Sequence, residues 1–425
     1  MELLLHLGGG ICYPFARSTT THVVGDSYME LNLQFGHGMM GHAKELVAQW
    51  GGGRIVLSPR DLTEAQLIRF AKELGKVGGT AILDPQCFAH DADHQRLVNH
   101  DYWKVYRHHQ TNAFAGGVAA AELLASLSVL ATKLGITTHI VPGLLATAVT
   151  PEWFAFQEGI LAEAPTHLKG RLLATVAVSE GVLRDEAAVE EIVDRAETWG
   201  VDGYYLVPET PAAYLVENPV WLANLLILAS GLKLTGREVV VGYCSHQMLC
   251  LAAAKVDAIA SGTWLNVRAF PPDKFYSPDD DEVSRRATWY YCPQALSEYK
   301  LPFLDIAKRA GLLAAMAPPP ELGSRFADPL FAGPNPTDVN WGEQAAFRHY
   351  LTSLRSQAAA STKATFDDTV AVHMATLDAA ESFLRPIRAA GVRGGDRDFS
   401  QYLDVNRAAL ADYVRARGPR FRRVW

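Results

Sequence analysis

The chain has few cysteines, and no two of them are spaced as a metal-binding or redox pair. Five cysteines are scattered over 425 residues, and none belongs to a CxxC pair. An odd and scattered set argues against a disulfide framework and against a structural zinc site. We therefore expect most of the cysteines to be small buried side chains, and we predict no bound metal. The five positions are Cys12, Cys87, Cys244, Cys250 and Cys292.

The sequence also lacks a long apolar run of the kind that crosses a membrane. Its apolar start, residues 1–7, is short, has no basic flank and leads into three glycines. Residues 3–7 are therefore interpreted as a first strand and not as a signal peptide. Hydrophobic residues make up 49% of the chain, which is typical of a globular protein with a sizeable core. We predict a cytoplasmic protein that does not contact membranes.

An excess of positive charge is absent as well. The formal net charge is −7, which argues against broad, non-specific binding to nucleic acid. The exception is a basic tail at residues 415–423, for which solvation is the default interpretation and phosphate or partner contact the alternative. The glycine runs at residues 8–10 and 51–53 lack the lysine of a P-loop and the spacing of a dinucleotide fingerprint. We therefore predict no cofactor.

A stretch rich in histidine and aspartate, residues 90–109, contains side chains of the types that bind metals. Its spacing does not match the HExxH pattern of a zinc helix, so a solvated or substrate-facing loop is the preferred interpretation. Aromatic residues in the same stretch could pack over a binding site.

What the sequence does contain is a series of short, buried strands separated by amphipathic helices. Apolar residues at three- and four-residue spacing predict helices at residues 63–74, 115–134, 151–164 and 186–199. Eight strands alternating with helices indicate a (β/α)8 TIM barrel, with a doubly wound sheet as the alternative. The predicted strands are residues 3–7, 55–57, 81–83, 139–141, 173–177, 203–206, 239–241 and 258–260.

The chain is predicted to divide into three parts. Residues 1–316 form the barrel with insertions, and the Pro/Gly-rich residues 317–340 form a linker. Residues 341–425 form a C-terminal helical region, with helices at 344–360, 365–389 and 399–415 and the basic tail at the end.

In a TIM barrel, chemistry takes place where the strands end and the helices have not yet begun. Asp84 is the best candidate for acid/base work, because a carboxylate at the end of a barrel strand can be desolvated. Glu209 is the second candidate, and for both carboxylates a purely structural role is a comparable alternative. Gln86, Glu180, Tyr204, Tyr205, Tyr243, His246, Ser261, Thr263 and Trp264 are the predicted ligand-binding residues.

Several stretches, in order, resemble the tRNA-guanine transglycosylase family. The resemblance is carried by residues 239–261, by Ser297-Glu298-Tyr299 and by residues 304–316, which read LDIAKRAGLLAAM. Asp202-Gly203-Tyr204 is similar to that family's sixth strand, and Asp84 falls where its first catalytic aspartate lies. The resemblance touches residues 80–316 in patches. It implies the barrel fold, a pocket for a 7-deazaguanine-type base and a homodimer.

The sequence departs from the family at three points. The family's nucleophilic aspartate follows a "VD" pair by three positions, and here that position is Ala260. The base-reading aspartate has no counterpart at residues 139–147, and the cysteine-rich zinc element is replaced by residues 265–293, with Cys292 alone remaining. We therefore predict no zinc subdomain, and a double displacement through a covalent glycosyl-aspartate cannot be written.

Three functions remain open, and the enzymatic status of the chain is undecided between them. The first is a divergent transglycosylase-like protein that binds or transfers a 7-deazaguanine-type base or nucleotide in bacterial antiviral defence, as such relatives do in DNA-modification clusters and cyclic-nucleotide-based (CBASS) operons. The second is a non-catalytic adaptor on the same barrel. The third is an unrelated (β/α)8 hydrolase. Partner proteins of a defence operon are expected under the first two, and tRNA is the least expected acceptor.

Overall fold

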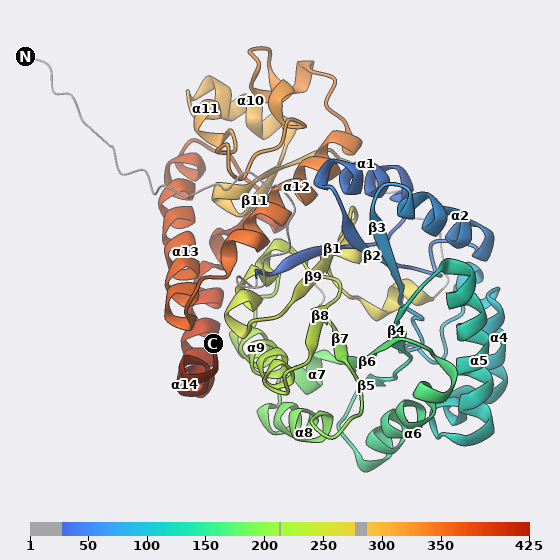
Figure 1. The fold of residues 1–425 in the computed structure, drawn as a ribbon. Coiled ribbons are helices and arrows are strands. Elements are labelled where there is room, and N and C mark those ends of the chain that lie inside the picture. The colour runs from blue at the N-terminus through green and yellow to red at the C-terminus, as the bar shows by residue number, and fades with distance from the viewer. Residues whose placement is uncertain (1–27, 212–213, 277–286) are drawn as a thin grey trace, which may run out of the picture.

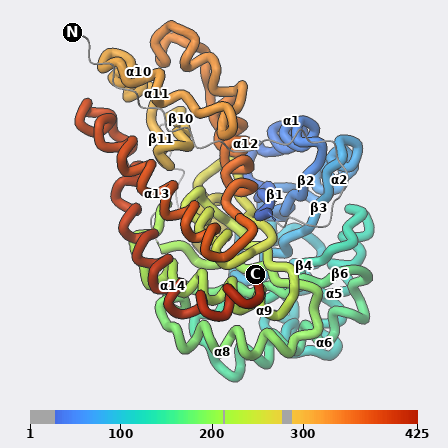
Figure 2. The backbone as a smooth tube through the Cα atoms, turned by 60° about the vertical axis from the view of Figure 1, so that its left-hand side comes forward, coloured from blue at the N-terminus to red at the C-terminus, as the bar shows by residue number. Residues whose placement is uncertain are grey.

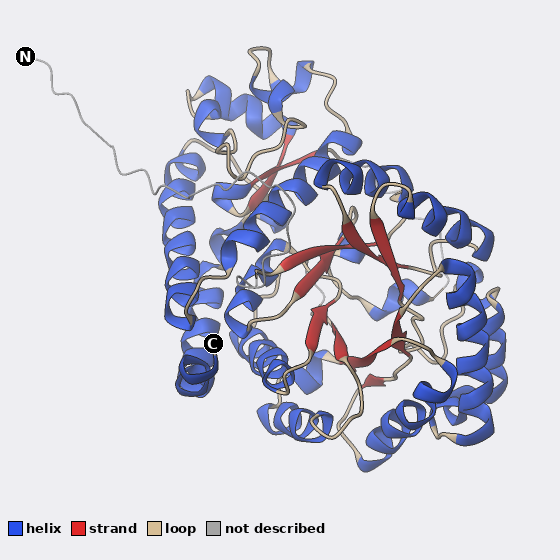
Figure 3. Cartoon of the chain, in the orientation of Figure 1, coloured by secondary structure: helices blue, strands red, loops and turns tan. Residues whose placement is uncertain are grey.

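The computed structural model describes residues 28–211, 214–276 and 287–425. Its centre is a ring of parallel strands, drawn red in Figure 3. The ring contains eight strands in the order β1, β2, β3, β4, β6, β7, β8, β9. β9 pairs with β1, and β3 contacts β4 without a hydrogen-bonded ladder, so the fold is a (β/α)8 TIM barrel. The strands are β1 (Glu30–Gln34), β2 (Gly53–Leu57), β3 (Gly79–Leu83), β4 (Thr138–Val141), β6 (Arg171–Val178), β7 (Gly203–Pro208), β8 (Glu238–Val241) and β9 (Ala258–Ser261), with the short β5 (Leu145–Ala146) beside β6.

Helices surround the ring (Figure 1). Local capping explains where several of them begin. Thr63 forms a reciprocal capping box with Gln66 at the start of α2, and Thr150 caps α6 immediately before a proline. The barrel helices are α1 (Met40–Trp50), α2 (Glu64–Gly75), α3 (Gln95–Val98), α4 (Asp101–His109), α5 (Gly117–Leu134), α6 (Pro151–His167), α7 (Glu180–Leu183), α8 (Glu186–Ala196) and α9 (Pro219–Leu234).

Seven of the eight predicted strands are confirmed as β2, β3, β4, β6, β7, β8 and β9. The predicted first strand, residues 3–7, lies outside the described residues. The place between β9 and β2 is taken by β1 (Glu30–Gln34), which the sequence interpretation missed. Its sequence, ELNLQ, alternates polar and apolar side chains, and two of the polar ones, Asn32 and Gln34, are buried in the barrel interior.

The four predicted barrel helices are confirmed as α2, α5, α6 and α8. The apolar stretch after β8 differs from expectation, because it is the 3₁₀ helix η2 (His246–Ala254) and not an α-helix. Ser245 caps it as predicted, and all nine of its residues are buried.

Helix α5 is long and apolar enough, by length and composition, to cross a membrane. In the structure it belongs to the outer ring of the barrel, where it packs against α2, α4 and α6. A helix that packs against neighbours on several sides buries apolar side chains against each of them, and this explains the apolar composition of α5 within the fold.

The C-terminal part contains the antiparallel hairpin β10 (Trp289–Cys292) and β11 (Ser297–Lys300) and five helices. α12 packs on β1 and β10, and α14 packs along α9, so this region covers one side of the barrel (Figure 2). The three predicted terminal helices are confirmed as α12, α13 and α14. The helices are α10 (Leu301–Arg309), α11 (Leu313–Met316), α12 (Glu343–Ser361), α13 (Phe366–Ala389) and α14 (Leu403–Val424).

The predicted basic tail is the end of α14. Four of its arginines are engaged within the protein. Arg417 pairs with Glu190 of the barrel and Arg422 with Asp367. Arg415 pairs with Asp412, and Arg423 donates to the carbonyl of Pro419. The terminal Trp425 packs on Phe366 and donates its indole N–H to the carbonyl of Lys363 at 3.0 Å. The tail is therefore largely a packing element and not a free cationic arm.

Candidate functional site

Asp84 follows β3 directly and lies fully buried at the carboxyl end of the barrel. Three groups donate hydrogen bonds to its carboxylate. The Tyr243 hydroxyl donates at 2.9 Å and the Tyr205 hydroxyl at 3.2 Å, both to Oδ2, and the backbone N–H of Gln86 donates to Oδ1 at 3.0 Å. Strands β3, β7 and β8, which are far apart in sequence, thus place their polar side chains around one carboxyl group.

The alternation of side chains along β7 decides which tyrosine reaches this site. Tyr205 points inward, and a Cβ on Gly242 would lie only 2.6 Å from its hydroxyl, so the glycine makes room for the ring. Tyr204 points outward, where its hydroxyl donates to the carbonyl of Ala196 on α8 at 2.8 Å. The predicted ligand-binding role of Tyr204 at the mouth therefore does not match its place in the barrel wall.

A second layer of hydrogen bonds holds Gln86. Its amide nitrogen donates to Ser58 Oγ at 2.9 Å, and its amide oxygen accepts from the backbone N–H of Arg60 at 3.0 Å. Ser58 in turn donates to Asp61 Oδ2 at 2.7 Å. Gln86 and Tyr243 both have positive φ, at 60° and 56°, a conformation that costs a non-glycine residue energy. Strain of this kind concentrates at functional sites, and here both strained residues contact Asp84.

The segment after β9 covers the site at the carboxyl end of the barrel. Lys274, on the short 3₁₀ helix η4 (Pro272–Phe275), places its Nζ 3.5 Å from the centre of the Tyr243 ring and donates to the carbonyl of Asn266 at 2.8 Å. Arg60 donates through Nε to the Lys274 carbonyl. Phe270 is also fastened, because its N–H donates to Thr210 Oγ1 at 3.0 Å. We call residues 265–276 the cover segment.

The electrostatics of the site follow from its burial. Desolvation raises the pKa of Asp84 to about 6, although the hydrogen bonds from Gln86 and Tyr243 and the charge of Lys274 oppose the rise. Burial also lowers the pKa of Lys274 well below its usual value, against the attraction of Asp61. A carboxyl group with a pKa near 6 can both donate and accept a proton close to neutral pH, which is the property of a general acid/base.

The other two predicted carboxylates, Glu209 and Glu180, lie next to each other and do not bond to Asp84. Glu209 Oε2 accepts from the backbone N–H of Glu180 at 2.9 Å, at the start of α7, where Ser179 supplies the cap. Glu180 forms an ion pair with Arg184 one turn later. Within the described residues, neither glutamate has a hydrogen bond to the Asp84 group, so Glu209 has the geometry of a helix-capping carboxylate.

His246, Ser261, Thr263 and Trp264 lie around a different group, built on Glu298. The buried Glu298 carboxylate accepts from Arg268, from Arg397 at 2.9 Å and from the Tyr214 hydroxyl at 2.9 Å. Burial opposes its ionisation, but Arg397 and Arg268 lower its pKa to about 2. Burial lowers the pKa of His246 to about 4, so this imidazole is neutral near pH 7.

The sequence interpretation missed several residues of both groups. Gln34 was missed with its strand, β1, although its Oε1 lies 3.3 Å from the Tyr205 hydroxyl oxygen. Ser58 and Asp61 directly follow β2, so the rule used for Asp84 could have found them. Lys274 has no local sequence signal, because only the folding of a distant segment over the mouth brings it to Tyr243.

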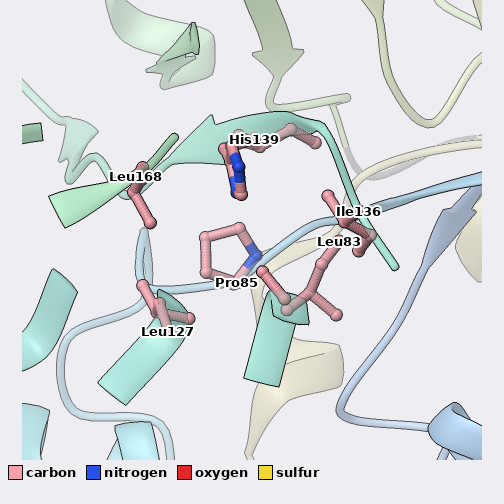
Figure 4. A pocket seen from close by; sticks show the side chains of 8 residues that line it. Leu83, Pro85, Leu127, Ile136, His139 and Leu168 are labelled. Atoms are coloured by element: carbon pink, nitrogen blue, oxygen red, sulfur yellow. The ribbon is translucent and has the colours of Figure 1, made fainter. Parts of the chain in front are cut away.

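A separate, small apolar recess lies between α5 and the contact of β3 with β4 (Figure 4). Leu83, Pro85 and Leu127 contribute to its walls. Its one imidazole, His139, already bonds to the carbonyl of Lys169 at 3.0 Å. The recess offers no free polar group that could orient a ligand, so we regard it as a packing gap.

The described residues contain no group of three or more histidine, cysteine, aspartate or glutamate side chains that could hold a metal ion. In the histidine-rich stretch, His100 bonds to the carbonyls of Pro59 and Leu62, and His109 contacts Glu122 at 2.6 Å. The four cysteines within the described ranges, Cys87, Cys244, Cys250 and Cys292, are free and buried.

Comparisons with known proteins give little. No protein family matches the chain, and none of the curated proteins matches it. Among solved structures, the carboxyl transferase domain of Rhizobium etli pyruvate carboxylase, determined with pyruvate and biocytin, is similar at 11% identity and a TM-score of 0.32. The match covers 92% of this chain and 61% of that one. A similarity this low carries no argument about function.

Proposed function

We propose that the barrel binds a 7-deazaguanine-type base at its mouth, with Asp84 as the group that exchanges a proton with it. The observation that carries the proposal is the buried carboxyl of Asp84, held between two tyrosine hydroxyls next to the amide of Gln86. A purine-like ring presents N–H donors and carbonyl acceptors on its edge, which are the groups that a carboxyl and an amide recognise. The resemblance of residues 239–261, 297–299 and 304–316 to transglycosylases supports the same ligand class.

The reaction proposed here has no covalent glycosyl intermediate. Ala260 lies on β9, fully buried, directly across from Asn32 of β1. A methyl group cannot attack a glycosidic carbon, so Asp84 serves in proton transfer and binding only. Within bacterial antiviral defence, such a protein would present or process a deazaguanine for a later acceptor, acting as a homodimer or with partner proteins of its operon.

Access to Asp84 requires movement of the cover segment. In the closed arrangement the Lys274 ammonium lies over the Tyr243 ring, where a planar base would stack. The hydrogen bonds of Phe270 to Thr210 and of Arg60 to Lys274 are those that must break on opening. Binding of the base would therefore expel Lys274 from its buried place and return its ammonium to water.

The closed mouth also favours a second candidate, a non-catalytic adaptor built on the same barrel. In that case the Asp84 group stabilises the closed barrel, and the outer surface of the C-terminal helices contacts partners. The unrelated hydrolase remains a third possibility and predicts no affinity for deazaguanine.

Calorimetric titration of the full chain with 7-deazaguanine and guanine separates these functions. We expect saturable binding that Asp84→Asn weakens at least about tenfold, because one charge-assisted hydrogen bond is worth roughly 1.5–3 kcal/mol. Glu209→Gln is the matched control and should bind like the unaltered chain. Absence of binding, or equal binding by Asp84→Asn, would refute the proposal and favour the adaptor. Mass spectrometry of a base and acceptor mixture would then show whether turnover accompanies binding.

A further inference from the structure

A cleft is lined in part by Leu265 and Arg268 of the cover segment, and Asp84 is not among its lining residues. The segment that follows β9 supplies Thr263 and Trp264, and the β10–β11 hairpin supplies Trp289. Helix α12 supplies Glu343 and Phe347. The cleft thus joins the barrel to the C-terminal region.

Flat surfaces form the walls of this cleft. Trp264 meets Phe347 edge to face, with ring centres 4.8 Å apart, and the indole N–H of Trp264 is fixed by the carbonyl of His37 at 3.0 Å. On the other wall, the Arg397 guanidinium lies 4.0 Å from the centre of the Trp289 ring. Indole and guanidinium planes of this kind stack on planar heterocycles.

Polar groups in the cleft have unused hydrogen-bonding capacity. Thr263 is 2% exposed, and its hydroxyl has no hydrogen-bond partner within the described part of the chain. A buried hydroxyl without a partner costs free energy, so a ligand that supplies one gains it. Glu343, at the first turn of α12, has no ion-pair partner among the described residues and can accept from N–H groups.

The balance of charge argues for a neutral ligand. Arg268 and Arg397 carry two positive charges at the cleft, and Glu298 and Glu343 carry two negative ones. Glu298 already pairs with both arginines. A phosphate or carboxylate would face Glu343 without a free cation to offset the repulsion.

We propose that this cleft is a binding site for a nucleobase or nucleoside, separate from the Asp84 site. The ring would stack against the Trp289 and Trp264 walls, its N–H edge would donate to Glu343, and Thr263 would donate to or accept from the same ring. The inference stands without the proposed function, because none of its groups contacts Asp84. Since Leu265 and Arg268 belong to the cover segment, a ligand in the cleft would touch that segment.

Isothermal titration of the full chain with guanosine tests this site. We expect saturable binding that Thr263→Val weakens about tenfold, the effect of one lost hydrogen bond. The same variant should melt at an equal or higher temperature without ligand, since it replaces an unpartnered buried hydroxyl by a methyl of the same shape. A hydroxyl with a structural role only would give lower stability and unchanged affinity.

Three further variants complete the test. Glu343→Gln should weaken guanosine binding about five- to tenfold, whereas Glu152→Gln, which changes the first turn of α6 in the same way, should not. Asp84→Asn should leave the guanosine affinity of the cleft unchanged. No saturable binding, or affinity that neither Thr263→Val nor Glu343→Gln alters, would overturn the inference. Loss of affinity in Asp84→Asn alone would place the base at the mouth, which contradicts the cleft site and keeps the proposed function.

Discussion

Replacing Asp84 by asparagine should make the protein more stable near neutral pH, although it removes a candidate catalytic group. Burial raises the pKa of Asp84 from 3.8 to about 6 in the folded chain. Because the folded pKa is the higher one, the protonated carboxyl favours the fold. That contribution is fully present below pH 3.8 and is lost as the pH rises through about 6.

The size of the effect follows from the two pKa values. A rise from 3.8 to about 6 corresponds to about 3 kcal/mol at roughly 1.4 kcal/mol for each tenfold change in the ionisation constant. Asparagine has nearly the shape of the protonated carboxyl and does not titrate. The free energy of unfolding of Asp84→Asn, relative to that of the unaltered chain, should therefore increase by up to about 3 kcal/mol between pH 4 and pH 7.

Two measurements check this prediction. Urea unfolding at several pH values, followed by tryptophan fluorescence, gives the change in relative stability. Infrared difference spectra between the unaltered chain and Asp84→Asn report the carbonyl band of the protonated carboxyl, whose loss should have a midpoint near pH 6. A midpoint near pH 4, or a stability difference that does not vary with pH, would refute the reasoning, because Asp84 would then be solvated or fully neutralised by Lys274.

Three more predictions follow from the same contacts. Lys274→Met keeps a side chain of similar length over Tyr243 but removes a positive charge, so the infrared midpoint of Asp84 should move above pH 6. An unchanged midpoint would show that the charge of Lys274 does not act on Asp84. Glu298→Gln should lower the free energy of unfolding by about 3–5 kcal/mol, because it leaves the buried Arg268 without its counter-ion. In the unaltered chain this stabilisation should be lost as the pH falls from 4.5 towards 2. A decrease below about 1 kcal/mol would contradict the pairing of Glu298 with Arg268. Gly242→Ala should lower the free energy of unfolding by about 1–3 kcal/mol because the new methyl meets the Tyr205 hydroxyl, whereas Gly41→Ala on α1, with open space around it, should not destabilise the protein.

The barrel was predictable from the sequence because most of its strands are buried on both faces. Runs such as Val239-Val240-Val241 are continuous and β-branched, and they need no partner to be recognised. β1 was missed for the opposite reason. Asn32 and Gln34 interrupt its apolar residues, because they point into the barrel interior, and that pattern resembles a half-exposed strand or a loop.

The site was predictable only in part. Asp84, Gln86, Tyr205 and Tyr243 were found because each lies on or directly after a strand, and parallel strands bring their carboxyl ends together. The rule gives the end of the barrel but not the direction of a side chain, so it also selected Tyr204, which alternation turns outward. It gives no information on loops that return from elsewhere, and Lys274 and Arg397 both arrive in that way.

The barrel interior supports the proposal that chemistry at this site differs from that of the family it resembles. The parallel register places Ala260 directly across from Asn32, and cross-strand neighbours on one face lie about 5 Å apart. Both polar atoms of the Asn32 amide lack hydrogen-bond partners among the described residues. A carboxylate in place of the Ala260 methyl would lie within reach of that amide and accept from it. The interior thus has a polar residue on β1 and no carboxylate opposite it on β9, which agrees with the proposed function without a covalent step. Under the proposed function, such a barrel would hold a base and exchange a proton with it through Asp84, without a covalent intermediate.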